Sequence, residues 1–125
     1  MPSTRDKGSD AERRAEAWLA RRGYVVIDRN HATRRGEVDL ICRDGGTLCF
    51  VEVRSRSDSV HGAPEETIDR RKALRVVAAA TDWARRHDSL DDEIRFDVLS
   101  ITGEGDDPVF ELFAGAFDAA GEPPP

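Results

Sequence analysis

The stretch EVDLICRDGGTLCFVEVR, residues 37–54, decides the fold. Two apolar runs flank Gly45-Gly46, and this two-residue loop fits a tight primed turn because both glycines can adopt positive φ. The turn sets which residues face one another in the predicted antiparallel hairpin. From the turn outward, the predicted facing pairs are Asp44–Thr47, Cys42–Cys49, Ile41–Phe50, Leu40–Val51, Asp39–Glu52, Val38–Val53 and Glu37–Arg54.

Because side chains alternate between the two faces of a strand, this hairpin has one wholly apolar face and one partly polar face. The residues predicted on the apolar, core-facing side are Val38, Leu40, Cys42, Cys49, Val51 and Val53. On the other face, the polar residues gather at the end away from the turn. There Asp39 lies opposite Glu52, and Glu37 lies opposite Arg54, so we predict a compact charged patch.

Asp39 and Glu52 need compensation in this arrangement. Two carboxylates directly opposite on a sheet have Cβ atoms about 4.5–5.5 Å apart, and like charges so placed are destabilising. A shared proton, the neighbouring Arg54, or a divalent cation such as Mg²⁺ would each relieve the repulsion. The alternative is a solvent-facing hairpin surface that carries an ordinary charge network.

A third carboxylate comes from residues 9–22, whose apolar residues recur at helical spacing and which end at Gly23. At about 100° per residue, Glu12 lies roughly 20° from Leu19 on the helix surface, at the edge of the apolar stripe. We therefore expect Glu12 to face the sheet. The alternative is a glutamate at the boundary of the helix with no further role.

The rest of the chain predicts one further helix and three further strands. The expected order is α-β-β-β-α-β-β, and the long helix between strands implies a crossover, hence an α/β fold with a mixed sheet flanked by helices. We predict a single domain over residues 9–117, with disordered tails at 1–8 and 118–125. The further expected segments are a strand at 24–27, a polar connection at 28–36, a loop at 55–64, a helix at 65–87 and strands at 93–101 and 109–113. The residues expected on the inner face of the second helix are Ile68, Leu74, Val77, Ala78, Thr81 and Ala84.

Composition indicates a small soluble protein, since 38% of the 125 residues are hydrophobic and 35% are charged. No apolar run approaches the roughly 18–20 residues of a membrane helix, and the polar N-terminus lacks the apolar core of a secretory signal, so we expect a cytoplasmic location. Cys42 and Cys49 are read as buried apolar residues. The net charge of −6 is unevenly spread: residues 1–75 carry a net charge of +3 and residues 76–125 a net charge of −9. A basic face therefore remains compatible with an acidic protein.

Several segments resemble a known family. GEVDLI and FVEVRSR, at residues 36–41 and 50–56, resemble the YraN-like family of small uncharacterised bacterial proteins. That family is assigned to the restriction-endonuclease-like fold with its PD-(D/E)xK motif. KGSDAER, residues 7–13, is similar to the N-terminus of archaeal Holliday junction resolvases of the same superfamily. The resemblance runs from about Lys7 to Ile101 and includes GYVVIDRN, a lysine on the second helix and RFDVLSI.

The resemblance implies that Asp39 and Glu52 are a metal-binding acidic pair and that Glu12 is the corresponding helix glutamate, with Mg²⁺ or Mn²⁺ as the cofactor. Arg54 takes the place of the motif lysine, which is a departure from the pattern. Arginine cannot act as a base, because its pKa lies above about 12. It can still hold a phosphate oxygen and stabilise developing negative charge.

Further residues receive supporting roles. Lys72 could supply an ammonium group from the second helix, and Glu37 most simply orients Arg54. Asp97 could do similar work or face solvent. The candidate phosphate contacts are basic residues before position 76, since positive side chains bind phosphate groups. Such contacts position a nucleic-acid backbone without reading its sequence. They are Arg34, Arg35, Arg56, Arg70, Arg71 and Arg75.

Three functional hypotheses follow. The first is a metal-dependent endonuclease that hydrolyses phosphodiester bonds of DNA, branched or structured DNA included, with Glu12, Asp39, Glu52 and Arg54 as catalytic residues. The second is a catalytically inactive nuclease-fold module that binds nucleic acid or a protein partner. The third makes the acidic C-terminal region an interaction surface. Resolvases of this superfamily cut as dimers, so the resemblance also implies a homodimer.

Overall fold

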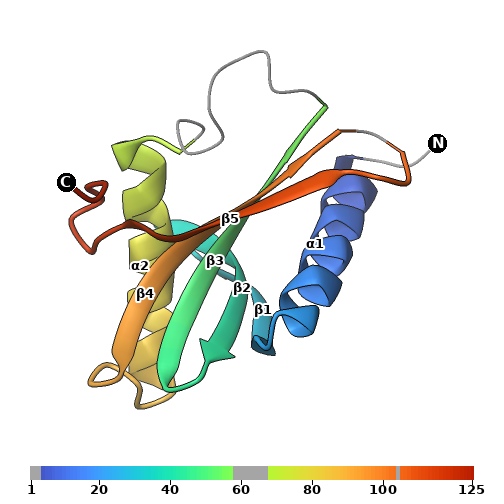
Figure 1. Ribbon diagram of the computed structural model, residues 1–125. Coiled ribbons are helices and arrows are strands. Elements are labelled where there is room, and N and C mark those ends of the chain that lie inside the picture. Colours follow the sequence, from blue (N-terminus) through green and yellow to red (C-terminus); the bar gives the residue numbers. More distant parts are fainter. Residues whose placement is uncertain (1–3, 58–67, 104) are drawn as a thin grey trace.

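The chain forms a five-stranded mixed sheet with one helix on each face (Figure 1). This computed structural model describes residues 4–57, 68–103 and 105–125. The elements in chain order are α1 (Thr4–Arg21), β1 (Val25–Thr33), β2 (Gly36–Asp44), β3 (Thr47–Arg56), α2 (Arg70–Arg86), β4 (Glu93–Thr102) and β5 (Val109–Phe117). The predicted α/β class, the mixed sheet and the order α-β-β-β-α-β-β are confirmed.

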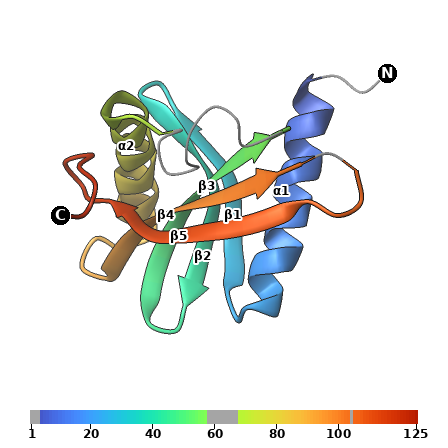
Figure 2. The same ribbon diagram turned by 45° about the horizontal axis from the view of Figure 1, so that its top comes forward.

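The strands follow one another across the sheet in sequence order, β1-β2-β3-β4-β5. Only β3 and β4 pair in parallel among these strands, because α2 carries the chain back across the sheet between them. Figure 2 shows α1 and α2 on opposite sides of this sheet. Neither helix of the described residues is both long and apolar enough to cross a membrane.

Two hydrophobic clusters, one on each face, hold the layers together. The cluster under α2 contains Phe50 and Trp83, whose rings meet edge to face at 5.9 Å. The cluster under α1 contains Leu19 and Leu40 together with the free cysteines Cys42 and Cys49. Both cysteines are fully buried, as predicted. Burying both faces explains why β2 and β3 are so rich in apolar residues.

The hairpin register is confirmed over its turn-proximal half, from Asp44–Thr47 to Leu40–Val51. The predicted faces are only partly correct. Val38 packs in the cluster under α2, whereas Leu40 packs in the cluster under α1. Val38 and Leu40 are two residues apart and would share a face in a regular strand. They point to opposite faces of the sheet because the regular β2–β3 ladder ends at Leu40 and the alternation breaks before Val38.

Two element boundaries near the N-terminus differ from the prediction. α1 begins at Thr4, inside the segment expected to be a disordered tail. The sequence did not predict this first part of the helix, because the polar residues before Ala11 show no apolar periodicity. Residues 28–33, expected to be a connection, continue β1. They form a ladder with β2 from Asp28–Ile41 to Thr33–Gly36, so strand pairing outweighs the weak β-propensity of polar residues.

The second helix is shorter than predicted, and it buries a different face from the one predicted. α2 begins at Arg70, and the carboxylate of Asp69 caps it by accepting the Lys72 N–H at 2.8 Å. Predicted residues 65–67 lie outside the described part of the chain. Leu74 and Thr81, which were expected to face inward, are exposed. The buried face is made mainly of small residues that let the helix approach the sheet, namely Ala73, Val76, Ala79, Ala80, Trp83 and Ala84.

The C-terminal end also departs from the prediction. β5 continues to Phe117 instead of ending at residue 113. The following residues, expected to be a disordered tail, turn back against the start of α2. There the Arg70 guanidinium donates to the Ala120 carbonyl at 3.2 Å and pairs with Glu122 at 3.0 Å. Gly121 is buried in this contact.

Asp97 on β4 is fully buried, so of the two alternatives given for it the solvent-facing one is wrong. Arg95 holds both of its carboxylate oxygens, with Nε 2.8 Å from Oδ1 and Nη2 2.9 Å from Oδ2. The Gly115 N–H donates to Oδ1 at 2.9 Å, and the Tyr24 hydroxyl donates to Oδ2 at 3.4 Å. Asp97 is therefore a fully compensated structural anion on the α1 face of the sheet.

Candidate active site

The site forms where β2 and β3 stop pairing regularly. Beyond Leu40–Val51, the Asp39 side chain takes over a ladder hydrogen bond, and its Oδ2 accepts the Val53 N–H at 2.8 Å. Glu52, next on β3, is buried. A local departure from the ladder thus turns two strand residues into a pair of close carboxyl groups at the end of the hairpin away from its turn.

Glu52 lies in an environment that favours its neutral form. Burial raises the pKa of the Glu52 carboxyl to about 9, and a hydrogen bond with Asp39 and the charge of Asp39 act in the same direction. Lys72 of α2, with Nζ 3.3 Å from Oε2, opposes this shift without outweighing it. A protonated Glu52 can donate to Asp39 while its other oxygen accepts from Lys72, which is the shared-proton arrangement expected of two facing carboxylates.

Glu12 approaches the same pair from α1. Partial burial raises the pKa of Glu12, and the charges of Asp39 and Glu37 raise it further. The prediction that Glu12 faces the sheet near the acidic pair agrees with this electrostatic coupling. Lys72 contacts Glu52 from α2, whereas Glu12 on α1 lies within the electrostatic influence of Asp39, so the two helices bring charged groups to the site from opposite faces of the sheet.

Asn30 on β1 is a site residue that the sequence pattern did not reveal. It has φ = 51°, which is uncommon for a residue other than glycine, and it lies between the pairs Arg29–Leu40 and His31–Val38, hence opposite Asp39. Its side chain hydrogen-bonds Glu12 and lowers the pKa of that carboxyl against the other effects. The one available signal was that asparagine tolerates this left-handed conformation.

Arg54 is half-buried on β3, where it pairs with Ser100 of β4. Side chains two residues apart on a strand share a face, so Arg54 projects on the same side as Glu52. Glu37 is exposed. The pair Glu37–Arg54 lies beyond the regular ladder, and the role of Glu37 in orienting Arg54 stays a prediction.

The donor set matches a divalent cation only in part. Among the residues that the structure describes, no group of three or more His, Cys, Asp or Glu side chains is arranged to hold a metal ion. Asp39 and Glu52 nevertheless lie together, and Mg²⁺ is commonly held by one or two carboxylates, with waters and a substrate phosphate filling its shell. The pair therefore fits such an ion chemically, with the cation taking the place of the shared proton.

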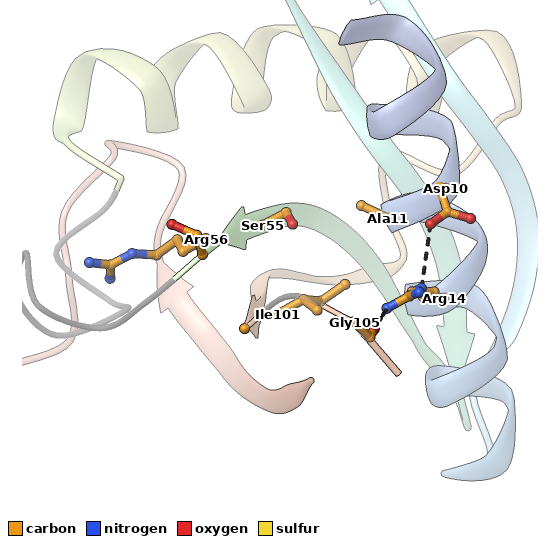
Figure 3. Close-up of a pocket in the computed structure, with 9 residues that line it drawn as sticks. Asp10, Ala11, Arg14, Ser55, Arg56, Ile101 and Gly105 are labelled. Atoms are coloured by element: carbon orange, nitrogen blue, oxygen red, sulfur yellow. Dashed lines mark hydrogen bonds and ion pairs between the residues drawn. The ribbon is translucent and has the colours of Figure 1, made fainter. Parts of the chain in front are cut away.

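A pocket of about 410 Å³ adjoins the end of β3 (Figure 3). Arg56, one of the predicted phosphate contacts, lines it together with Ser55 and with Asp10 and Arg14 of α1. Arg14 donates to the Gly105 carbonyl at 3.0 Å and pairs with Asp10, so it joins α1 to the segment after β4. The dashed lines of Figure 3 mark these two contacts.

The other predicted phosphate contacts lie along α2 and at the β1–β2 turn. Arg34 and Arg35 form the exposed turn, and Arg71 and Arg75 are exposed on α2. The third α2 residue of the predicted set, Arg70, is engaged by the C-terminal segment. Arg85 and Arg86, which the sequence reading did not select, lie with Arg34 and Arg35 around one groove.

Comparison with known proteins places these residues in a family. A family model described as "Uncharacterised protein family UPF0102" matches residues 11–101, a range that includes Glu12, Asp39, Glu52 and Arg54. The chain belongs to the UPF0102 family. It is 59% identical to a UPF0102 protein of Anaeromyxobacter sp. strain Fw109-5 over 95% of this chain and 90% of that protein.

More distant UPF0102 relatives cover nearly as much of the chain. A UPF0102 protein of Chromohalobacter salexigens is 46% identical over 93% of this chain and 94% of its own length. One from Vibrio cholerae is 41% identical over 82% of this chain and 86% of its own length. The resemblance to the YraN-like family is therefore confirmed.

Proposed function

We propose that this UPF0102 protein is a metal-dependent nuclease that hydrolyses phosphodiester bonds, with DNA as its substrate. The observation that carries the proposal is the contact between the buried Glu52 carboxyl and the Asp39 carboxyl; burial first, and then the hydrogen bond and charge of Asp39, raise the pKa of Glu52 to about 9. Burying two like-charged groups together costs stability, and strongly perturbed pKa values of this origin gather at functional sites. A purely structural acid would resemble Asp97, which is matched by Arg95.

Asp39 and Glu52 would hold one or two Mg²⁺ or Mn²⁺ ions, and Glu12 would add a third carboxylate from α1. When bound, such an ion lowers the pKa of a coordinated water and offsets charge on a phosphate. Asn30 holds Glu12 in place through its side-chain hydrogen bond. Lys72 keeps an ammonium group 3.3 Å from Glu52, where it favours the charged form of the carboxylate that a cation requires.

Arg54 would act on the substrate and not on the water. As a general property, an arginine guanidinium donates hydrogen bonds and is no base, so this side chain can stabilise the charge that develops on a phosphate but cannot activate water. A lysine at this position could do both. If Arg54 is a weakened catalytic group, Arg54→Lys will raise the cleavage rate; an unchanged or lower rate would contradict that role.

The deciding experiment is a cleavage assay. End-labelled single-stranded, duplex, flap and four-way DNA would be incubated with purified protein in Mg²⁺, in Mn²⁺ or in EDTA, beside the Asp39→Asn variant. We expect product that depends on metal and disappears in the variant. Absence of product from every substrate would overturn the nuclease proposal.

A second candidate function is a nuclease-fold module that binds nucleic acid or a protein without cutting. Two observations favour it: Arg54 replaces the motif lysine, and the described side chains include no group of three metal-ligating residues in place. This candidate predicts salt-dependent binding without product. A cytoplasmic location and a homodimer stay predictions, which cell fractionation and light scattering on the purified protein would check.

A further inference from the structure

A groove of about 930 Å³ lies between the β1–β2 turn and the exposed side of α2. It is separate from the pocket at the end of β3, with which it shares no lining residue. We call it the basic groove, after the charged residues in its lining. These are His31, Arg34, Arg35, Asp82, Arg85 and Arg86.

The position of the turn beside α2 is fixed by backbone contact. A Cβ atom at Gly36 would lie 1.9 Å from the Arg75 carbonyl oxygen, so only glycine allows β2 to begin this close to the helix. The Thr33 hydroxyl accepts the Arg35 N–H at 3.1 Å and stabilises the turn itself. Arg34 and Arg35 are therefore presented next to α2 on a defined backbone.

Positive charge dominates the groove. Four arginines line it against one acid, Asp82, and that acid is already engaged. Its Oδ2 lies 2.8 Å from Nε2 of His31 and 2.9 Å from Nε of Arg86. The whole chain has a net charge of −6, so this excess of positive charge is a local feature of the groove. A local positive potential favours a polyanion as the ligand of the groove.

The same helix connects the basic groove to the acidic pair. Lys72 in the first turn of α2 contacts Glu52, and Arg85 in the last turn lines the groove. At 1.5 Å per residue the two positions are about 20 Å apart. This separation corresponds to about six base pairs of duplex, at 3.4 Å per base pair.

The groove suits a duplex better than a single strand. Proteins that bind single strands stack the bases on aromatic side chains. The described residues that line the basic groove include no Phe, Tyr or Trp. Arginines without a stacking platform fit a backbone whose bases are already stacked inside a helix.

We propose that the basic groove binds the phosphate backbone of a duplex nucleic acid about six base pairs from the bond presented to Asp39 and Glu52. The inference rests on the proposed function for the position of that bond. The groove itself is tested by binding alone, without cleavage.

Binding is measured by fluorescence anisotropy of labelled duplex DNA and duplex RNA in EDTA, with Asp39→Asn protein so that no cutting occurs. The test variant adds Arg85→Ala and Arg86→Ala. The matched control adds Arg13→Ala and Arg21→Ala, two exposed arginines on α1 that remove the same charge from the other face of the sheet. We expect the groove variant to bind about tenfold more weakly and to lose about one unit of salt slope for each arginine that contacts a phosphate.

Equal weakening in the control, an unchanged salt slope in the groove variant, or no binding of either duplex at low salt would each overturn the inference. A second measurement uses duplexes that extend different lengths from a flap or end. Affinity is expected to rise once the arm exceeds about six base pairs and to stay flat with length in the groove variant. Absence of cleavage by the unsubstituted protein would contradict the proposed function alone, so the two failures are distinguishable.

Discussion

Asp97 and Glu52 are buried acids on neighbouring strands, yet their surroundings are opposite. In the parallel β3–β4 ladder Asp97 pairs with Val51, the residue before Glu52, so the two acids are adjacent in register. Asp97 projects toward α1, where Arg95, Tyr24 and the Gly115 N–H surround it. Glu52 projects toward α2, where it meets another carboxylate and one lysine.

The difference teaches that burial alone does not mark a functional acid. A buried charge with a bidentate arginine partner stabilises the fold only if the pair stays intact. A buried carboxyl that faces a second carboxyl leaves repulsion that a proton or a cation can relieve. The first arrangement is complete within the protein, whereas the second leaves room for an added cation.

The largest expected effect is on cleavage. Glu52→Gln should reduce metal-dependent cleavage by about a thousandfold, because a lost metal ligand removes several kcal/mol of transition-state stabilisation. At neutral pH the thermal midpoint should stay the same or rise, since glutamine is neutral like the protonated Glu52 and folding then requires no proton uptake. Glu93→Gln, an exposed residue at the start of β4, serves as the matched control and should keep both properties. A large loss of stability in Glu52→Gln would make Glu52 a structural acid like Asp97.

Asp97→Asn should show the reverse. Removing one partner of a buried ion pair leaves Arg95 without its counter-charge and should lower the free energy of unfolding by about 3 kcal/mol. Urea denaturation would measure this, with the exposed Asp107→Asn as the control. Any remaining folded protein should cleave at the normal rate. A stable Asp97→Asn protein with impaired cleavage would erase the distinction between the two acids.

Substitution of Asn30, which positions Glu12, should have an intermediate effect on cleavage. Asn30→Gly keeps the positive φ and removes the amide that holds Glu12, so cleavage should fall about tenfold with little change in stability. Asp88→Gly is the matched control, because Asp88 has φ = 52° in the turn after α2, far from the acidic pair in sequence. It should leave cleavage unchanged. Equal cleavage by Asn30→Gly and the unsubstituted protein would show that the amide has no positioning role.

The Glu52 carboxyl also predicts a pH dependence of stability. Burial raises the pKa of Glu52 to about 9, above its ordinary value of 4.5, so between these values the folded state holds a proton that the unfolded state releases. This contribution is complete below pH 4.5 and is lost as the pH rises toward 9, by at most about 1.4 kcal/mol per pH unit. Urea denaturation at several pH values would give this slope, and Glu52→Gln should flatten it. An identical slope in the two proteins would contradict the raised pKa.

Local rules predicted the centre of the sheet well. Gly45-Gly46 and alternation were enough to pair Cys42 with Cys49 and to predict that Asp39 lies near Glu52, although the regular ladder ends at Leu40–Val51, before that pair. Alternation also holds on β4, where Phe96 and Val98 pack in the same cluster under α2. These features depend on neighbours in sequence and on the period of a strand, which a single chain displays directly.

What the sequence did not reveal depends on contacts between distant segments. The polar half of β1 is a strand because β2 lies beside it, and Val38 changes face because the ladder ends. Leu74 was assigned to the core, but it lies against the C-terminal turn at Gly121. Asn30 belongs to the site because β1 continues past it and pairs with β2. Arg85 and Arg86 line the basic groove because the β1–β2 turn lies beside them.

The crossover through α2 also affects the order in which parts of the protein fold. The β1–β2–β3 meander closes only short loops, so it can form early, whereas the parallel β3–β4 contact must wait for a far longer loop that includes α2. Asp39 and Glu52 belong to the meander, and Lys72 arrives with the crossover. We therefore expect the nascent chain to bring its two carboxylates together before their ammonium neighbour docks, so that the docking of α2 completes the site.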